Sequence, residues 1–186
     1  MIGRLPTKVA VGDIEWDIRT DYRDILTIFC AFNDPELNTE EKVIVCLTIF
    51  YIDFDKLNPS LYKEAYERAI WFFNQGKNQE DKHSPKLLDW EQDESLIFSE
   101  VNKVAGMEVR NLEYMHWWTF MGYYMGIGEG LFSEVLNIRS KKAKNKKLEK
   151  HEKEFYAQNK SLIDLKIKLS EEEKEAQKEL EELLGL

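Results

Sequence analysis

The sequence predicts a mainly α fold, in which an N-terminal β-hairpin packs on a bundle of about six helices and a C-terminal helical arm follows. Three observations lead to this prediction. Hydrophobic residues alternate at the start of the chain, they recur at helical spacing from Asp21 onward, and the composition becomes strongly basic after Arg139. The chain has 186 residues, of which 43% are hydrophobic. This length suits one core domain, residues 1–140, with an appended charged helical arm, residues 141–186.

Two short alternating runs predict the N-terminal hairpin. They flank Gly12 and Asp13, a two-residue turn of the kind that joins antiparallel strands. The alternating hydrophobic residues are Val9, Val11, Ile14, Trp16 and Ile18. Because an isolated hairpin is only marginally stable, we expect it to lie on the helices that follow.

The next two segments carry helical signals, although the second leaves an alternative open. The first helix begins near Asp21 and stops at residues 33–35, whose sequence is Asn-Asp-Pro. Asn38 and Glu41 have the spacing of a capping box for the second helix, which extends to about Ile52. Residues 43–52, VIVCLTIFYI, are rich in β-branched side chains, so a strand is the alternative there. One face of the first helix carries Ile25, Ile28, Phe29 and Phe32.

Further helices are predicted from caps and breakers. Pro59 opens a third helix, which ends at Gly76, and residues 76–86 form a polar loop. Asp89 is the expected N-cap of a fourth helix over residues 90–106, closed by Gly106. After the aromatic residues 113–127, the sequence LFSEVLNIR (131–139) begins a sixth helix.

The composition disfavours several classes of protein. A net charge of −9 gives the chain no overall attraction for nucleic acid or for an anionic membrane. No segment approaches 18 consecutive apolar residues, and the N-terminus has no export signal, so we expect a soluble intracellular protein without a membrane partner. Cys30 and Cys46 lie in apolar runs and are expected to be buried, reduced thiols.

The inventory of metal-ligating and nucleophilic residues is poor. Glu113 and His116 have the Glu-x-x-His spacing that places two ligands on one helical face, but a di-iron site needs a second such pair. Glu80 and His83 share that spacing within a polar loop, and His151 lies in a lysine-rich stretch. We therefore expect no metal, no cofactor and no catalytic residue. The glycine-rich residues 126–130 lack the Lys-Ser/Thr pair of a phosphate loop, and a helix–helix turn is expected there.

Residues 113–127, EYMHWWTFMGYYMGI, concentrate aromatic and sulfur-containing side chains. The first interpretation is a central core helix whose Trp and Tyr polar atoms find hydrogen-bond partners. The second is an adaptable surface that accepts an apolar helix. The two interpretations overlap, since one face can be core and the other an interface. The candidate partner-binding residues are Trp117, Trp118, Met121, Tyr124 and Met125.

A basic run is the local exception to the acidic balance. It consists of Arg139, Lys141, Lys142, Lys144, Lys146 and Lys147. We interpret it first as a solvated helix face. A contact with an acidic protein segment, such as the Glu-rich residues 171–175 of this chain, is the functional alternative. Nucleic acid is disfavoured, because no aromatic side chains are interleaved to stack on bases.

Four stretches of the chain resemble the bacteriophage "gene product fifteen" family. They are LPTKVAVGDIEWDIRTDYRDIL, DWEQDESLIFSEVNKVAG, EYMHWWTFMGYYMGI and FSEVLNIRSKKAKNKKLEKHEKEFYAQNK. The resemblance carries over no catalytic residue. It implies a protein encoded in the tail module of a long-tailed phage or prophage, acting in the cytoplasm of the bacterial host.

Proteins in that position resemble tail assembly chaperones. The implied partners are the tape measure protein, which the chaperone covers, and the tail-tube protein, which it helps to recruit. The alternative is a structural tail completion or connector component of the virion. In either case the arm, with its narrow stripe of Leu180, Leu183 and Leu184, suits docking on the body, on another protein, or on a second copy in a homo-oligomer.

Overall fold

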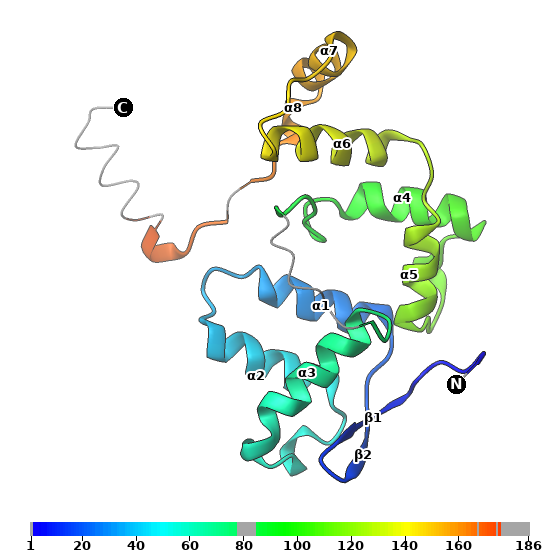
Figure 1. Ribbon diagram of the computed structural model, residues 1–186, viewed down its shortest axis with the longest axis vertical. Coiled ribbons are helices and arrows are strands. Elements are labelled where there is room, and N and C mark those ends of the chain that lie inside the picture. Colours follow the sequence, from blue (N-terminus) through cyan, green and yellow to red (C-terminus); the bar gives the residue numbers. More distant parts are fainter. Residues whose placement is uncertain (1, 78–84, 167, 174, 176–186) are drawn as a thin grey trace.

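The hairpin and helices follow the predicted order. The computed structural model describes residues 2–77, 85–166, 168–173 and 175. The hairpin, α1, α2 and α3 form one end of the molecule, and α4, α6, α7 and α8 form the other, with α5 beside α1 and α4 (Figure 1). This arrangement confirms the mainly α fold with an N-terminal hairpin. The elements are β1 Lys8–Val11, β2 Ile14–Asp17, α1 Tyr22–Phe32, α2 Thr39–Phe50, α3 Tyr62–Phe73, α4 Glu94–Ala105, α5 Trp117–Met125, α6 Leu131–Ala143, α7 Lys150–Gln158 and α8 Lys160–Ile163.

The antiparallel hairpin packs on α3, as the sequence predicts. Val9 pairs with Trp16 and Val11 with Ile14, and both valines are buried. Gly12 has a φ of +59° in the connecting turn, a conformation that glycine adopts without steric cost. Its N–H donates to the Glu64 carboxylate of α3 at 3.0 Å, which ties the turn to the helix beneath it.

The second predicted helix is a helix, so the strand alternative for residues 43–52 is wrong over most of that range. The Asn38 side chain accepts from the N–H of Glu41, and the Glu41 side chain accepts from the N–H of Asn38. This capping box nucleates α2, whose helical hydrogen bonds outweigh the β propensity of its side chains. Extended backbone begins only at Tyr51, which forms an isolated bridge with Ile18.

The fourth helix begins later than predicted. Asp89 does not cap it; the Asp89 carboxylate accepts from the N–H groups of Glu91 and Gln92 and closes a separate turn. The helix α4 starts at Glu94, after Asp93, whose side chain makes no capping hydrogen bond. Its predicted end is confirmed, because Gly106 takes the left-handed conformation with a φ of +70°.

The C-terminal part of the chain is only partly separate from the body. The helix α6 runs through the predicted domain boundary after residue 140, and α8 packs on α6 with Ile163 fully buried. Residues 126–130 connect α5 to α6, which confirms the predicted helix–helix turn. Ser170 and Glu173 exchange capping-box hydrogen bonds of 2.8 and 3.1 Å. The leucine stripe at Leu180, Leu183 and Leu184 lies outside the described residues.

One buried hydrophobic cluster connects all of these elements. Its largest fully enclosed side chains come from α1 through α6 and from Tyr51. Cys46 is buried and Cys30 half-buried, and both are free thiols. Within the described part of the chain, no helix has the length and apolar character that crossing a membrane requires.

Candidate functional site

The aromatic segment enters its helix at His116, and not before. His116 is the N-cap of α5, with extended backbone, and its Nδ1 accepts from the N–H of Trp118 at 3.0 Å. Its Nε2 lies 3.0 Å from the carbonyl oxygen of Pro6. Burial lowers the pKa of this imidazole. Glu113 lies outside the helix and is exposed, so the Glu-x-x-His spacing does not place the two side chains on one helical face.

The two tryptophans of α5 belong to the protein's own core. Trp117 is 1% exposed, and its indole N–H donates to the carbonyl of Phe73 at 3.0 Å. Trp118 is half-buried and donates in the same way to the carbonyl of Phe72 at 2.8 Å. These bonds join α5 to the last turn of α3. In the first turn of α5, the aromatic side chains therefore belong to the core of the protein.

The exposed part of α5 is its last turn. Met121 and Tyr124 are half-buried, and the Tyr124 ring contacts Trp90 at a centroid distance of 5.3 Å. Met125 is 56% exposed. At the end of α4, Val104 and Met107 are also exposed. Of the five candidate contacts predicted from the sequence, only Met125 presents most of its surface to solvent.

A groove lies between α1 and α4. It has a volume of about 400 Å³. Tyr22 and Phe98 supply aromatic rings to its floor, and Leu26 and Trp90 add further apolar surface. A second hollow of about 410 Å³ shares Thr27, Cys30 and Glu91 with the first and continues past the end of α1. The residues that line the first hollow are Tyr22, Arg23, Leu26, Thr27, Cys30, Trp90, Glu91, Glu94, Phe98 and Arg110.

The rim of this groove is charged. The Arg23 guanidinium lies 4.6 Å from the centre of the Tyr22 ring, and that of Arg110 lies 5.1 Å from the centre of the Phe98 ring. Arg110 also binds the Glu108 carboxylate and lowers the pKa of that group to about 2. Glu91 and Glu94 supply the acidic part of the rim. An apolar floor with charged edges fits one face of an amphipathic helix.

Sequence reasoning missed this groove. Its two walls come from residues separated by more than sixty positions, such as Arg23 and Trp90. The one local signal is that Leu26 lies outside the buried stripe of α1 and is only half-buried. A hydrophobic residue beside the core stripe of a helix does not by itself distinguish a groove from an ordinary surface residue.

Arg139 is not part of an exposed basic surface. Its side chain is 6% exposed and forms a bidentate ion pair with Asp93, at 2.6 and 2.8 Å. The same guanidinium donates to three backbone carbonyls. All five of its N–H donors are thus engaged. The carbonyls belong to Leu87, Leu162 and Ile163.

The lysines of the basic run divide into two groups. Lys141 pairs with Glu152, and Lys142 pairs with Asp164 and lies over the Tyr156 ring at 4.0 Å. These contacts hold α7 and the end of α8 against α6. The exposed lysines without such a role in the described structure are Lys144, Lys146 and Lys147.

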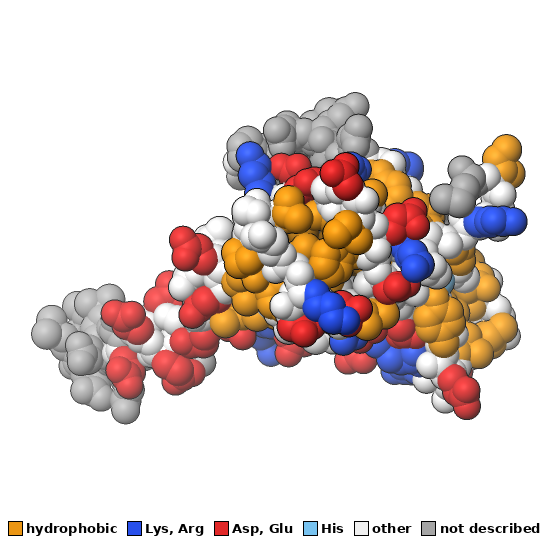
Figure 2. Space-filling view, turned by 90° about the horizontal axis from the view of Figure 1, so that it is seen from below, with side chains coloured by type: hydrophobic (Ala, Val, Ile, Leu, Met, Phe, Trp, Pro, Cys, Tyr) orange, Lys and Arg blue, Asp and Glu red, His pale blue; other side chains and the backbone are white. Residues whose placement is uncertain are grey.

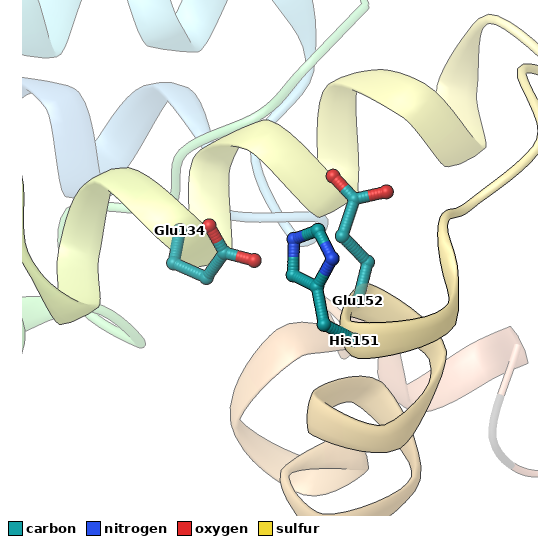
Figure 3. Close-up of side chains that lie close together, drawn as sticks. All are labelled: Glu134, His151 and Glu152. Carbon is teal, nitrogen blue, oxygen red and sulfur yellow. The ribbon is translucent and has the colours of Figure 1, made fainter.

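Among the described residues, one group has the composition of a metal site. Glu134 on α6 and His151 and Glu152 on α7 bring ligand atoms within 4.8 Å of one another (Figure 3). Both oxygens of Glu152 already accept hydrogen bonds, one from Lys141 and Asn137 and the other from the N–H of Glu149. A cation at this position would have to displace the Lys141 ammonium. The arrangement therefore favours an ion pair that fastens α7 to α6, and the prediction of no metal stays a prediction.

This ion pair predicts a pH-dependent stability. The Lys141 hydrogen bond, followed by the N–H of Glu149, lowers the pKa of Glu152 from 4.5 to about 2. A carboxyl whose pKa is lower in the folded than in the unfolded state stabilises the fold above pH 4.5 and loses that contribution as the pH falls toward 2. We expect Glu152→Gln to unfold at lower urea concentration than the unmodified protein at pH 7, with a difference that shrinks steadily below pH 4.5. Glu154→Gln, an exposed change on the same helix, is the control. A Glu152→Gln difference that is constant across this range would contradict the assignment.

One of the comparisons with known proteins gave a match. The family model described as Bacteriophage Gp15 protein matches residues 1–165. Searches of curated proteins and of solved structures gave no match. The match includes the hairpin, all helices through α8, both walls of the groove and the Asp93–Arg139 pair.

Proposed function

The chain belongs to the bacteriophage Gp15 protein family, and from this premise we propose that it is a tail assembly chaperone. It would cover the tape measure protein in the cytoplasm of the bacterial host and help to recruit tail-tube subunits. Tape measures are long amphipathic helices, whose apolar stripes need cover until the tail is built. The observation that carries the proposal is the groove between α1 and α4, whose apolar floor and charged rim suit such a helix.

The groove can provide affinity without high selectivity. Leu26 and Trp90, which are half-buried, offer apolar and aromatic surface, which tolerates different side chains on a bound helix. Arg23 and Arg110 add cations that acidic side chains at the edge of that helix can reach. One such contact is weak, and many copies bound along one tape measure would hold by avidity.

The exposed end of α5 is a second contact in this proposal. Met125, with Val104 and Met107, offers flexible apolar surface outside the groove. The Trp117 side chain is enclosed in the core of the protein, so it would contribute to partner binding only by positioning α5. Trp118, Met121 and Tyr124 would contribute only the edges that they leave uncovered.

Co-expression with the neighbouring tape measure tests this proposal. We expect the unmodified protein to raise the soluble fraction of the tape measure several-fold. Thr27→Glu places a carboxylate on the groove side of α1 at an exposed position and should remove most of that gain. Thr48→Glu, at an exposed position on α2, is the matched control and should retain it. A tape measure that precipitates equally with and without the protein would contradict the chaperone role.

Mass spectrometry of purified phage particles separates the chaperone from its alternative. A chaperone should be absent from the particles or present in traces. A fixed copy number in mature particles would instead identify a structural tail completion or connector component.

A further inference from the structure

The chain after α8 runs along the edge of the groove. The Gln92 side chain exchanges two hydrogen bonds, of 2.9 and 2.8 Å, with the backbone of Lys166. Lys168 forms an ion pair with Glu91 and lines the second hollow. The N–H of Glu171 donates to the Glu36 carboxylate at 2.6 Å. These contacts place Lys168 and Glu171, which belong to the described part of the C-terminal segment (residues 168–186), at the end of the groove that lies beyond α1.

The described part of this segment then leads away from the body. Residues 171–173 are helical and exposed, and they project beyond the α1–α2 end of the molecule (Figures 1 and 2). The Ser170–Glu173 capping box starts a helix in this direction. The sequence of residues 171–184 contains no Gly, Pro, Asn or Asp that would favour a reversal. The described residues 171–173 thus lie outside the groove of their own chain.

We propose that the C-terminal segment of one copy docks in the α1–α4 groove of a second copy. Leu180, Leu183 and Leu184 have the i, i+3, i+4 spacing of anchors that enter an apolar groove from one helical face. The groove offers Leu26, Trp90 and Phe98 to these side chains. The outcome is self-association through the groove and the segment.

The charges beside the leucine stripe agree with this occupant. Glu179, Glu181 and Glu182 flank the leucines, with Lys178 as the one basic residue among residues 176–186. In the groove, the cations Arg23 and Arg110 lie on the rim, over aromatic rings of the floor. Arg23 is also paired with Asp21, and Arg110 with Glu108, so acidic side chains beside the leucines would share these guanidinium groups with the chain's own carboxylates. The Glu91 carboxylate of the rim is already paired with Lys168.

This inference rests on the proposed function, because it uses the same groove. The C-terminal segment would compete with the tape measure helix for that groove. Free protein would keep its groove covered by another copy until a client helix displaces the segment. The experiments below contain no tape measure. A negative result in these experiments would therefore contradict only the proposed self-association. A negative result in the co-expression test would contradict only the proposed chaperone role.

Analytical ultracentrifugation of the full-length chain is the first test. We expect concentration-dependent self-association that Leu183→Glu/Leu184→Glu weakens at least tenfold. Thr27→Glu should weaken it equally, while Thr48→Glu leaves it unchanged. An equimolar mixture of the two deficient variants should regain association, because one supplies an intact segment and the other an intact groove. A chain that is monomeric at all concentrations, or variants that associate as the unmodified chain does, would overturn the proposal.

Cross-linking identifies the occupant directly. Cys30 lies in the groove and is half-buried, whereas Cys46 is enclosed in the core, so a bismaleimide addresses Cys30 in the folded chain. Adding Leu184→Cys to the full-length chain should give a covalent dimer, separated from monomer on a denaturing gel. The same chain without the added cysteine is the control and should give little dimer. Linkage between Cys30 and residue 184 of one chain, detected by peptide mass spectrometry, would overturn the assignment to a second copy.

Discussion

Replacing Arg139 by methionine is expected to lower the free energy of unfolding by about 3–5 kcal/mol, the usual cost of removing one member of a buried ion pair. The change leaves the Asp93 carboxylate, whose side chain is 2% exposed, without its bidentate partner. It also leaves the carbonyls of Leu87, Leu162 and Ile163 without the guanidinium donors. Urea denaturation followed by circular dichroism measures the loss.

Two further variants distinguish this role from a general need for positive charge. Lys144→Met removes a cation at the end of the same helix, where the side chain is exposed, and should change the stability by no more than about 0.5 kcal/mol. Asp93→Leu/Arg139→Met removes both charges together and should recover part of the loss, because no ion is then left buried alone. Equal effects of Lys144→Met and Arg139→Met would contradict the structural role of Arg139.

Trp117→Ala is expected to cost about 3–5 kcal/mol, which is typical of truncating a large buried aromatic side chain. The indole ring lies within 6.0 Å, centre to centre, of the rings of Phe29, Trp90 and Phe120. Its removal opens a cavity where α1, α4 and α5 meet and leaves the Phe73 carbonyl without its donor. Thermal and urea unfolding should show the same loss.

Met125→Ala is the matched change on the same helix. Because Met125 is 56% exposed, its truncation should alter stability by no more than about 0.5 kcal/mol. Trp117→Ala and Met125→Ala thus separate the core part of the aromatic segment from the part that is open to a partner. A stability loss at Met125 as large as that at Trp117 would mean that both side chains are core.

The parts of the fold that the sequence predicts correctly are set by neighbouring residues. The hairpin turn at Gly12, the Asn38–Glu41 capping box and the left-handed Gly106 each depend on contacts or conformations within a few positions. Such signals are readable because the competing long-range contacts at those sites are weak. The same reason explains the correct break at residues 126–130 between α5 and α6.

The start of α4 is misplaced because both nearby carboxylates are engaged elsewhere. Asp89, the predicted N-cap, accepts from the N–H groups of Glu91 and Gln92, and the carboxylate of Asp93 binds Arg139, 46 positions away. Glu113 and His116 do not share a helical face, because His116 is the N-cap of α5, and its ring forms a hydrogen bond with the carbonyl of Pro6, 110 positions away. Arg139 is a basic residue beside several lysines, and no spacing in the sequence indicates that its side chain is buried while theirs are not.

In the candidate site, too, local features are predictable from the sequence and long-range features are not. The sequence predicts a core helix with one face open to a partner, whereas in the structure the exposure is concentrated at the last turn, where Met125 lies. The groove is different, because α1 contributes one wall and the chain beyond residue 90 contributes the other. No periodicity or motif in either segment indicates that the two walls will face each other.

The long sequence separation between α1 and α5 also bears on synthesis of the chain. Thr20 binds Tyr114, and Asp21 accepts from the N–H of Met115, each across 94 positions. At 5–20 residues per second, a ribosome needs roughly 5–20 s to supply these partners. During that interval the Tyr22 ring lacks Phe120, on which it stacks at 4.7 Å in the finished protein. The nascent chain therefore leaves the part of α1 that packs on α5 uncovered for seconds, until translation delivers α5.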